Sequence, residues 1–388
     1  MKFLNRIVLC TSLLLTSYLT ANDMCGIPEG CLPVSSGSNF LNCLSFKAEG
    51  LYLQAREDGL EYATSFHEVS RTIDGFEDSF LKYKDHSPRF SNRLGYRVGI
   101  DFCNPCSCWN IGASYLSYRT SAHGSVHQKA SLSPLATAVA APVAAPVAND
   151  LTDLQAKQTV LSSSRSGVVG LFSNFADGDI LDSVCSSLKL RLDIVDVDIN
   201  RSFCINECFS INPYVGFRYL RLKQKYRVRS EGISTTFVTT HDRVRLKDDF
   251  SGWGIHAGLK SDWEFGCGLS LYGMFGGSLL CGSDHLDHKE AFSVVNTSTP
   301  TSETSILKGR SHHKGARATA EAGLGILYDY CFCENQTIRL KLGWEFLFLS
   351  HVNRFASATD FPDSGSSRDR RCGDLSLQGL VFGFDYGF

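Results

Sequence analysis

The chain lacks a long hydrophobic run, and it lacks an excess of charge of either sign. After residue 21 no stretch reaches the ~18 consecutive apolar residues that a transmembrane helix needs, so no membrane-spanning helix is expected. The 38 Lys and Arg residues nearly balance the 40 Asp and Glu residues, which gives a formal net charge of −2. This balance does not suggest a nucleic-acid partner.

The first 21 residues have the pattern of a secretory signal peptide. Lys2 and Arg6 precede an apolar run over residues 7–19, and residues 20–22 supply small side chains for cleavage after Ala21. Removal of the two cations changes the formal net charge from −2 to −4. The mature chain is therefore expected outside the cytoplasm, either as a soluble protein or as a barrel that crosses a membrane with strands.

Alternation of apolar and polar residues is the pattern that recurs along the chain. From Leu380 to the final aromatic, every second residue is large and apolar, which is typical of a strand with one apolar face. Residues 93–102, 316–330 and 338–348 alternate in the same way. A soluble sheet would bury such faces under a second layer, whereas an outer-membrane barrel turns them to lipid.

The alternating segments predict an all-β fold, namely a transmembrane antiparallel up-and-down β-barrel with short periplasmic turns and long external loops. About ten strands are expected, or twelve if residues 237–246 add a short hairpin. Residues 22–42 form a Cys-containing periplasmic tail and residues 43–388 the barrel. Residues 119–184, which include an Ala/Pro-rich tract, form a long external loop. The bacterial outer membrane is the expected location.

Other segments are expected to depart from regular strands. Residues 56–92 are predicted to be a loop, because they are polar, charged and turn-rich and show no sustained period. Residues 223–249, which are strongly basic, and residues 282–315, which hold most of the histidines, are predicted to be loops as well. Within residues 188–199 the apolar positions shift from even to odd numbers, and this change of phase predicts a β-bulge near Val195.

Polar residues on the face opposite the apolar one are expected to line the lumen. The candidates carry both signs of charge: Arg97, Asp101, Lys260, Asp262, Arg317, Glu321, Asp329, Arg339, Lys341 and Glu345. Mixed charge argues against strong selectivity for one sign of ion. A ring of ten strands encloses a narrow interior. Two alternatives stay open: inward glycines keep a small solute path open, or acids and bases pair across a plugged lumen.

Fourteen cysteines follow the signal, and an even set of this size in an oxidising compartment predicts disulfides. Eleven of them fall on the expected periplasmic side: Cys25, Cys31, Cys43, Cys103, Cys106, Cys108, Cys204, Cys208, Cys267, Cys331 and Cys333. Their connectivity cannot be read from the sequence. Bridges within the chain, bridges to other envelope proteins and bridges to further copies of the chain are all alternatives.

No catalytic, metal or cofactor site is predicted, and the chain is not expected to be an enzyme. Asp284, His285, Asp287 and His288 have the chemistry of a metal site or of a barrel protease, but no second acid pair can be matched to them, and a solvated loop is the preferred interpretation. The motif Gly252-x-Gly254-x-x-Ala257 matches a dinucleotide-binding loop in sequence only. It lies inside a segment with the period of a strand and no helix follows it, so it is discounted.

Four blocks of the sequence carry a resemblance to a known family: residues 44–66 with Lys47-Ala48-Glu49, Gly95-Tyr96-Arg97-Val98-Gly99, Pro213-Tyr214-Val215-Gly216-Phe217-Arg218, and 252–280. Together they are similar to the pore-forming outer-membrane protein family typified by the Legionella major outer-membrane protein. The resemblance implies a porin that lets small solutes and ions diffuse passively. The alternative is a structural or adhesive envelope protein whose barrel is a non-conducting anchor.

Two features bear on partners. Phe384, Tyr386 and Phe388 resemble the terminal signal that barrel-assembly machinery reads, so this machinery and outer-membrane lipid are expected partners. The cysteine content departs from the family and is similar to the disulfide-linked envelopes of chlamydia-like bacteria, which implies covalent links to envelope proteins or a homo-oligomer.

Overall fold

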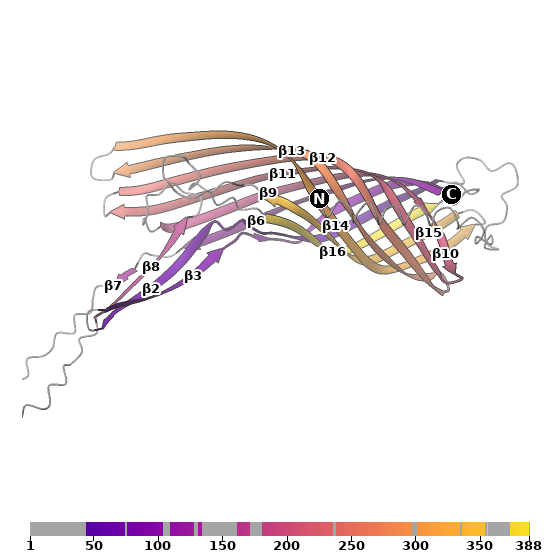
Figure 1. Ribbon diagram of the computed structural model, residues 1–388, viewed down its shortest axis with the longest axis horizontal. Coiled ribbons are helices and arrows are strands. Elements are labelled where there is room, and N and C mark those ends of the chain that lie inside the picture. Colours follow the sequence, from indigo (N-terminus) through magenta and orange to yellow (C-terminus); the bar gives the residue numbers. More distant parts are fainter. Residues whose placement is uncertain are drawn as a thin grey trace, which may run out of the picture.

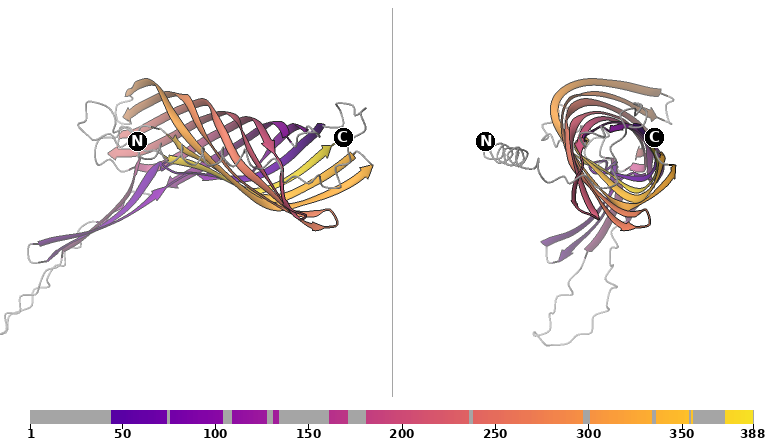
Figure 2. Two further views of the ribbon diagram at one scale, coloured as in Figure 1. Left: turned by 45° about the vertical axis from the view of Figure 1, so that its right-hand side comes forward. Right: turned by 90° about the vertical axis from the view of Figure 1, so that its right-hand side faces the viewer.

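In the computed structural model of the protein, ten long antiparallel strands close into a ring (Figures 1 and 2). The structure describes residues 44–73, 76–103, 109–127, 131–133, 161–170, 181–235, 238–296, 301–333, 336–353, 355 and 373–387. No described helix is long and apolar enough to cross a membrane. The predicted signal peptide, the N-terminal tail and the Ala/Pro tract lie outside the described residues.

Sixteen strands occur in the described residues, ten of which form the ring. The ring strands are β1 (Leu44–Glu57), β5 (Arg93–Cys103), β6 (Trp109–His127), β9 (Leu181–Arg201), β11 (Phe209–Thr235), β12 (Val238–Gly266), β13 (Leu269–Asn296), β14 (Thr301–Cys333), β15 (Gln336–Asn353) and β16 (Gly373–Gly387). The others are β2 (Ala63–Ile73), β3 (Phe76–His86), β4 (Arg89–Phe90), β7 (Ser131–Ser133), β8 (Leu161–Gly170) and β10 (Phe203–Asn206).

Each ring strand pairs with its neighbours in the ring, and the ring closes where β16 pairs with β1 along Phe46↔Tyr386 to Glu57↔Leu375. At the level of the apolar belt closure leaves no free edge, which is what a sheet in lipid requires. Leu44, Gly387 and the described connections 202–208 and 267–268 lie on one rim, which we take as periplasmic. The prediction of a ten-stranded antiparallel barrel is confirmed.

The turn between β12 and β13 illustrates how tight this rim is. Cys267 and Gly268 both have positive φ, 55° and 77°. Two central residues with positive φ make a type I′ turn, whose twist matches that of the two flanking strands. The sequence Gly266-Cys267-Gly268 therefore fixes the register in which β12 pairs with β13.

A belt of outward apolar side chains surrounds the barrel. On β11 it contains Val215, Phe217 and Tyr219, and on β12 it runs from Phe265 to Trp253. These side chains are exposed although they are apolar, and Phe217 exposes 65% of its surface. Lipid is the solvent that makes such exposure favourable. On β1 the belt ends at Tyr52, because the next outward residues, Gln54 and Arg56, are polar.

The change of phase in β9 is not a bulge. Pairing of β9 with β11 continues without a shift from Asn200↔Tyr214 to Ser183↔Glu231, and pairing with β6 is regular as well. Odd residues such as Val195 point outward throughout, and even residues such as Leu192 point inward. The apolar residues change face because the barrel interior becomes apolar at the level where the exterior becomes aqueous. The predicted bulge near Val195 was therefore wrong.

The ring strands β9 and β11 to β14 continue far past the belt and form a tall curved sheet (Figure 1). Segments 223–249 and 282–315, which were predicted to be loops, are strand in their described parts. The described part of the predicted hairpin, residues 238–246, is the start of β12 and adds no strand to the ring. Residues 56–92 contain β2 to β4. Strands β2, β3, β7 and β8 form an antiparallel extension of the same sheet, which joins the ring where Val168 of β8 pairs with Leu181 of β9.

Candidate functional site: the barrel lumen

The inward side chains of the barrel form two layers, a charged layer toward the periplasmic rim and an apolar layer above it. Alternation within each strand places Glu49 inward between the outward Ala48 and Gly50, and Arg218 inward between Phe217 and Tyr219. The same period that turns large apolar groups to lipid therefore turns ionisable groups into the lumen.

The first group of ion pairs joins β1, β5 and β15. Arg97 donates from Nη1 to Glu49 Oε2 at 2.5 Å and from Nη2 to Glu345 Oε2 at 2.8 Å. Lys341 Nζ donates to Glu49 Oε1 at 2.8 Å and to Glu345 Oε1 at 2.9 Å. Two cations and two carboxylates thus alternate in a closed square. Because each charge has two opposite partners, the group is electrically balanced.

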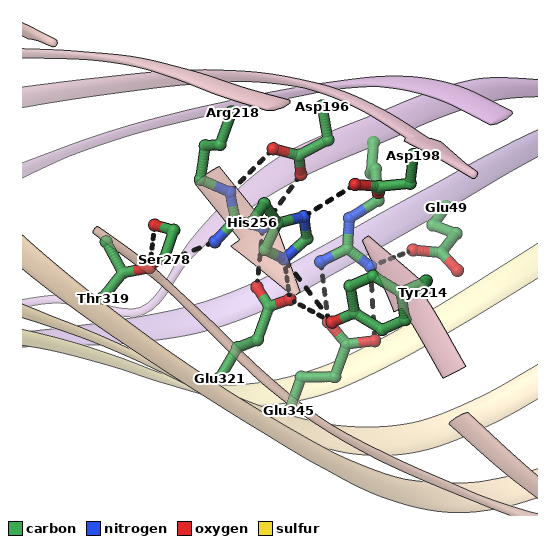
Figure 3. A network of polar contacts seen from close by, with 11 residues as sticks. Glu49, Asp196, Asp198, Tyr214, Arg218, His256, Ser278, Thr319, Glu321 and Glu345 are labelled. Carbon is green, nitrogen blue, oxygen red and sulfur yellow. Dashed lines mark hydrogen bonds and ion pairs between the residues drawn. The ribbon is translucent and has the colours of Figure 1, made fainter. Parts of the chain in front are cut away.

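The second group lies on β9, β11, β12 and β14 (Figure 3). Arg218 donates to both carboxylate oxygens of Asp196, at 2.7 and 2.9 Å, and to Glu321 Oε2 at 2.9 Å. The His256 ring contacts Asp198 Oδ1 through Nδ1 at 3.0 Å and Glu321 Oε1 through Nε2 at 2.7 Å. Tyr214 also donates to Glu321 Oε1, at 2.9 Å. Glu321 therefore collects donors from two other strands.

These two groups brace the barrel across its interior. The side chain of Arg218 exposes only 3% of its surface, and Glu49 and Glu345 each expose 8%. Removing one member of a buried ion pair costs about 3–5 kcal/mol, because the partner is left charged and unpaired. The interior is thus a specific arrangement of paired charges, and its members depend on one another.

A cavity of about 220 Å³ lies among these groups. It extends from Lys47, Asp101 and Asp385 near the periplasmic rim to Leu53 and Leu377 at its outer end. At ~30 Å³ per molecule this volume has room for about seven waters. Six cationic side chains and eight carboxylates line it, so the lining carries a small excess of negative charge when His256 is not counted.

An apolar layer lies directly above the cavity. Its members are buried and come from eight of the ring strands: Leu51, Leu53, Ala55, Leu116, Tyr118, Leu190, Leu192, Ile194, Leu220, Leu222, Phe250, Leu280, Leu349, Val352, Leu375, Leu377 and Val381. Leu192, Leu220 and Leu280 are fully buried. A layer contributed from all around the ring fills the lumen at this height, in the manner of a small barrel packed with side chains.

The structure places most of the predicted lumen residues around the cavity. Those that line it are Arg97, Asp101, Lys260, Asp262, Glu321, Arg339, Lys341 and Glu345. Asp329 pairs with Arg339 at 2.6 and 3.0 Å nearer the rim. Arg317 does not line the cavity. It lies higher, where its guanidinium is 3.8 Å from the centre of the Phe250 ring and pairs with Asp284.

The centre of the second group was missed by the sequence analysis. Arg218, Asp196 and Asp198 are inward, but the supposed bulge in β9 hid the regular alternation of Asp196 and Asp198 with Val195 and Val197. A continuous phase through residues 193–199 is the signal that finds them. His256 was assigned to the polar face of its strand, but its pairing with β14 residues, 65 positions away, has no local signature.

The Asp284, His285, Asp287 and His288 cluster does not converge on one point. These residues lie on β13, so alternate members point to opposite faces. Asp284 is inward with Arg317, whereas His285 is outward, 4.5 Å from the His312 ring. Asp287 is outward and pairs with Arg310 at 3.2 Å. No group of three or more His, Cys, Asp or Glu with the arrangement of a metal site occurs among the described residues.

Cys204, Cys208 and Cys267 on the periplasmic rim form no disulfide with one another. All three are exposed thiols on turns. Cys103 ends β5, and Cys331 and Cys333 lie on the last residues of β14. Cys25, Cys31, Cys43, Cys106 and Cys108 are outside the described residues, as is Phe388 of the predicted assembly signal. Phe384 of that signal points outward on β16.

A closed antiparallel ring with an outward apolar belt and a charged interior defines a transmembrane β-barrel of the bacterial outer membrane. The chain belongs to the family described as the Legionella pneumophila major outer membrane protein precursor, whose sequence pattern matches residues 41–388. The predicted family is thereby confirmed. A comparison with curated proteins found no match.

Solved structures of other outer-membrane proteins resemble the chain only distantly. The outer membrane protease OmpT from Escherichia coli shares 11% identity, with a TM-score of 0.38, over 91% of this chain and 99% of its own. A Pseudomonas aeruginosa FadL homologue shares 9% identity, with a TM-score of 0.22, over 89% and 90%. The P. putida toluene transporter TodX shares 7%, with a TM-score of 0.22, over 89% and 90%.

Proposed function

We propose that the protein is a narrow outer-membrane pore for small polar solutes and ions, closed at the apolar layer in the conformation described above. The observation that carries the proposal is the cavity of about 220 Å³, lined by charges of both signs, between the periplasmic rim and the apolar layer. An eight-stranded barrel is just wide enough for side chains to fill, so solvent space inside this ten-stranded ring supports a path for small solutes.

The lining indicates the kind of solute. Eight carboxylates and six cationic side chains favour small cations weakly over anions, since the two signs largely compensate. Passage past Leu192 and Leu222 requires these side chains to move, because a dry apolar constriction stops conduction by excluding water. The channel is therefore expected to open only briefly, and its single-channel current steps are expected to be small. A diffusion pore of this kind is not an enzyme and needs no cofactor.

A second candidate is a structural or adhesive envelope protein with a non-conducting barrel. The apolar layer favours it, since a lumen filled from eight strands is what a permanently closed barrel requires. The tall sheet of β11 to β14 favours it too, because it carries 27 to 33 residues per strand, far more than the 9 to 11 needed to cross the membrane. Covalent links through rim cysteines fit the same role.

Single-channel recording separates the two candidates. The refolded mature chain is inserted into a planar bilayer, and current is recorded with and without reductant. The pore proposal expects discrete steps with a mild preference for cations in a salt gradient. A folded, heat-modifiable barrel that shows no steps in either condition would contradict the pore and support the anchor.

A further inference from the structure

Basic side chains gather on the outward surface of the tall sheet, above the apolar belt. We call this set the basic face; its members are Lys189, Lys225, Arg227, Arg229, Arg243, Arg245, Lys247, Lys289 and Lys308. All nine are exposed and occupy outward positions on β9, β11, β12, β13 and β14. They stand on the same side of the barrel wall that contacts lipid lower down.

The register sets like charges directly beside each other. One row across four strands reads Arg227, Arg245, Lys289 and Lys308, since these residues are consecutive cross-strand partners. The next row contains Lys189, Lys225 and Lys247. Side chains directly opposite on one face are ~5 Å apart at Cβ, and like charges at this distance destabilise a sheet. Such an arrangement is stabilised when an anion lies against it.

Among the described residues the two rows contain a single carboxylate, Asp287, which is the cross-strand neighbour of Lys247. Nearer the membrane the outward cations have carboxylate partners: Arg191 pairs with Asp193 at 2.7 Å and Arg221 with Asp249 at 3.2 Å. At the rim of the basic face Arg310 pairs with Asp287 at 3.2 Å. No ion pair involves any of the nine cations of the basic face among the described residues. Within the described part of the chain the nine cations are thus left available to an anionic ligand.

The height of the basic face limits what that anion is. Arg227 lies eight residues past Tyr219, the last belt residue on β11. At ~3.4 Å per residue and a tilt of ~40° this is about 20 Å above the belt. The headgroup zone of a phospholipid bilayer is only about 5–8 Å deep on each side. A simple phospholipid anchored at the belt would therefore not reach Arg227, whereas a lipid with an extended charged head would.

A neighbouring cavity has the same charge character. It measures about 950 Å³ and is lined by Lys84, Arg89, Arg227 and Arg229, with Asp85 as its single carboxylate. The cavity borders the basic face through Arg227 and Arg229. It offers a recess in which an anionic sugar substituent would meet several cations at once.

We propose that the basic face binds the phosphorylated or otherwise anionic sugars of an outer-leaflet glycolipid whose acyl chains lie against the apolar belt below. Continuity with the lipid-facing belt selects a membrane lipid over a soluble polyanion. The row of Arg227, Arg245, Lys289 and Lys308 is the core of the surface. The bound lipid cancels the repulsion within the rows and holds the tall sheet upright.

The test is binding of labelled lipopolysaccharide to the folded full chain in detergent micelles, measured by fluorescence anisotropy. The variant R227Q/R245Q removes two unpaired cations. The matched control R191Q/R310Q removes two cations of the same outward surface that have carboxylate partners. At about fivefold per surface cation, the first variant is expected to bind about 25-fold more weakly, and the control within about threefold of wild type.

Competitors identify the ligand chemistry, and heat-modifiability on gels checks that each variant is folded. Dephosphorylated lipopolysaccharide is expected to compete more weakly than the intact form, and heparin, which has no acyl chains, more weakly still. The proposal is overturned if R227Q/R245Q binds within threefold of wild type, or if the control loses as much affinity. Heparin that competes better than lipopolysaccharide would assign the basic face to a soluble polysaccharide instead.

Discussion

Arg218 Nη2 lies 2.9 Å from Glu321 Oε2, although the two residues are 103 positions apart and stand on strands separated by β12 and β13. The hydrogen bond therefore crosses the lumen instead of following the sheet. His256, from β12, contacts the other oxygen of the same carboxylate at 2.7 Å. The side chain of Glu321 on β14 thus connects directly to β11 and β12, although backbone pairing links β14 to these strands only indirectly, through β13.

Cross-lumen pairing has a cost for transport. A side chain that braces the wall also occupies the space through which a solute would pass. The cavity that remains is about 220 Å³. Stability and conduction are therefore coupled in this barrel, and variants that loosen the interior are expected to change both.

The first prediction concerns the square of charges around Arg97. The variant R97Q leaves Glu49 and Glu345 buried with Lys341 as their shared cation. We expect the free energy of unfolding, measured by urea titration in lipid vesicles, to fall by about 3–5 kcal/mol. The matched variant R339Q breaks a more exposed pair with Asp329 and should cost about 1 kcal/mol or less. Equal losses for both variants would show that burial of the square contributes nothing.

The sequence predicted the barrel because the alternation of apolar and polar residues within each spanning strand indicates which face contacts lipid and which faces the lumen. In β5 the outward Tyr96, Val98 and Ile100 alternate with inward Arg97 and Asp101, so one strand alone indicates lipid on one side and a polar lumen on the other. The count of ten strands followed from the spacing of such segments. These are local properties, because a period of two can be recognised in the sequence without knowledge of the tertiary structure.

The tall sheet was not predicted, because above the belt the two faces of each strand exchange character. There the apolar residues point inward and the polar residues point outward. Tyr226 and Val228 are buried inward while Arg227 and Arg229 are exposed outward, which is the pattern of a soluble protein. Within one strand the apolar face thus passes from outside to inside at Tyr219 and Leu220. Read as a single pattern, this inversion resembles a bulge or a loop. Only the register of neighbouring strands distinguishes the cases.

Long-range pairing in the lumen was also beyond the sequence. Lys341 and Glu345 were recognised as inward, but their contact with Arg97 depends on ring closure between β15, β16, β1 and β5. The curvature of the ring decides which inward charges meet. No spacing along the chain encodes that curvature.

The second prediction concerns the apolar layer. Leu192 and Leu222 are cross-strand partners on β9 and β11, exposed by 0% and 2%. The double variant L192A/L222A removes volume from the closed part of the lumen and should raise single-channel conductance at least twofold, while the barrel loses about 2–5 kcal/mol of stability per site. The outward variant V195A, on the lipid side of β9, is the control and should leave conductance unchanged. An unaltered conductance in L192A/L222A would place the barrier elsewhere.

The third prediction is a dependence of stability on pH. Glu57 lies beyond the belt on β1, and burial raises the pKa of its carboxyl from 4.5 to about 8. Between these values the folded chain holds a proton that the unfolded chain releases, so this group lowers stability progressively as pH rises from about 4.5 to 8. Gln224 Nε2 donates to Glu57 Oε1 at 2.8 Å, and the variant E57Q retains an acceptor for it.

Relative to wild type, E57Q is therefore expected to gain stability across that interval, by up to about 1.4 kcal/mol per pH unit, and to gain nothing below pH 4.5. Urea unfolding at a series of pH values measures the difference. E231Q removes one negative charge from an exposed site and controls for net charge. A constant difference between E57Q and wild type from pH 4 to 9 would contradict a buried, protonated Glu57.

The fourth prediction concerns the rim cysteines. Cys204 and Cys208 lie on the β9–β11 connection and Cys267 on the β12–β13 turn, all exposed and without a disulfide among the described residues. Thiols exposed on one rim in an oxidising compartment are expected to pair with thiols of other molecules. Outer membranes prepared with an alkylating agent should therefore show multimers on non-reducing gels that reductant converts to monomer.

The triple variant C204S/C208S/C267S should lose most of these multimers, whereas C281S, which changes an exposed thiol on the wall of the barrel, should keep them. Multimers that persist unchanged in the triple variant would assign the links to other cysteines, and monomer throughout would leave the rim thiols without a crosslinking role.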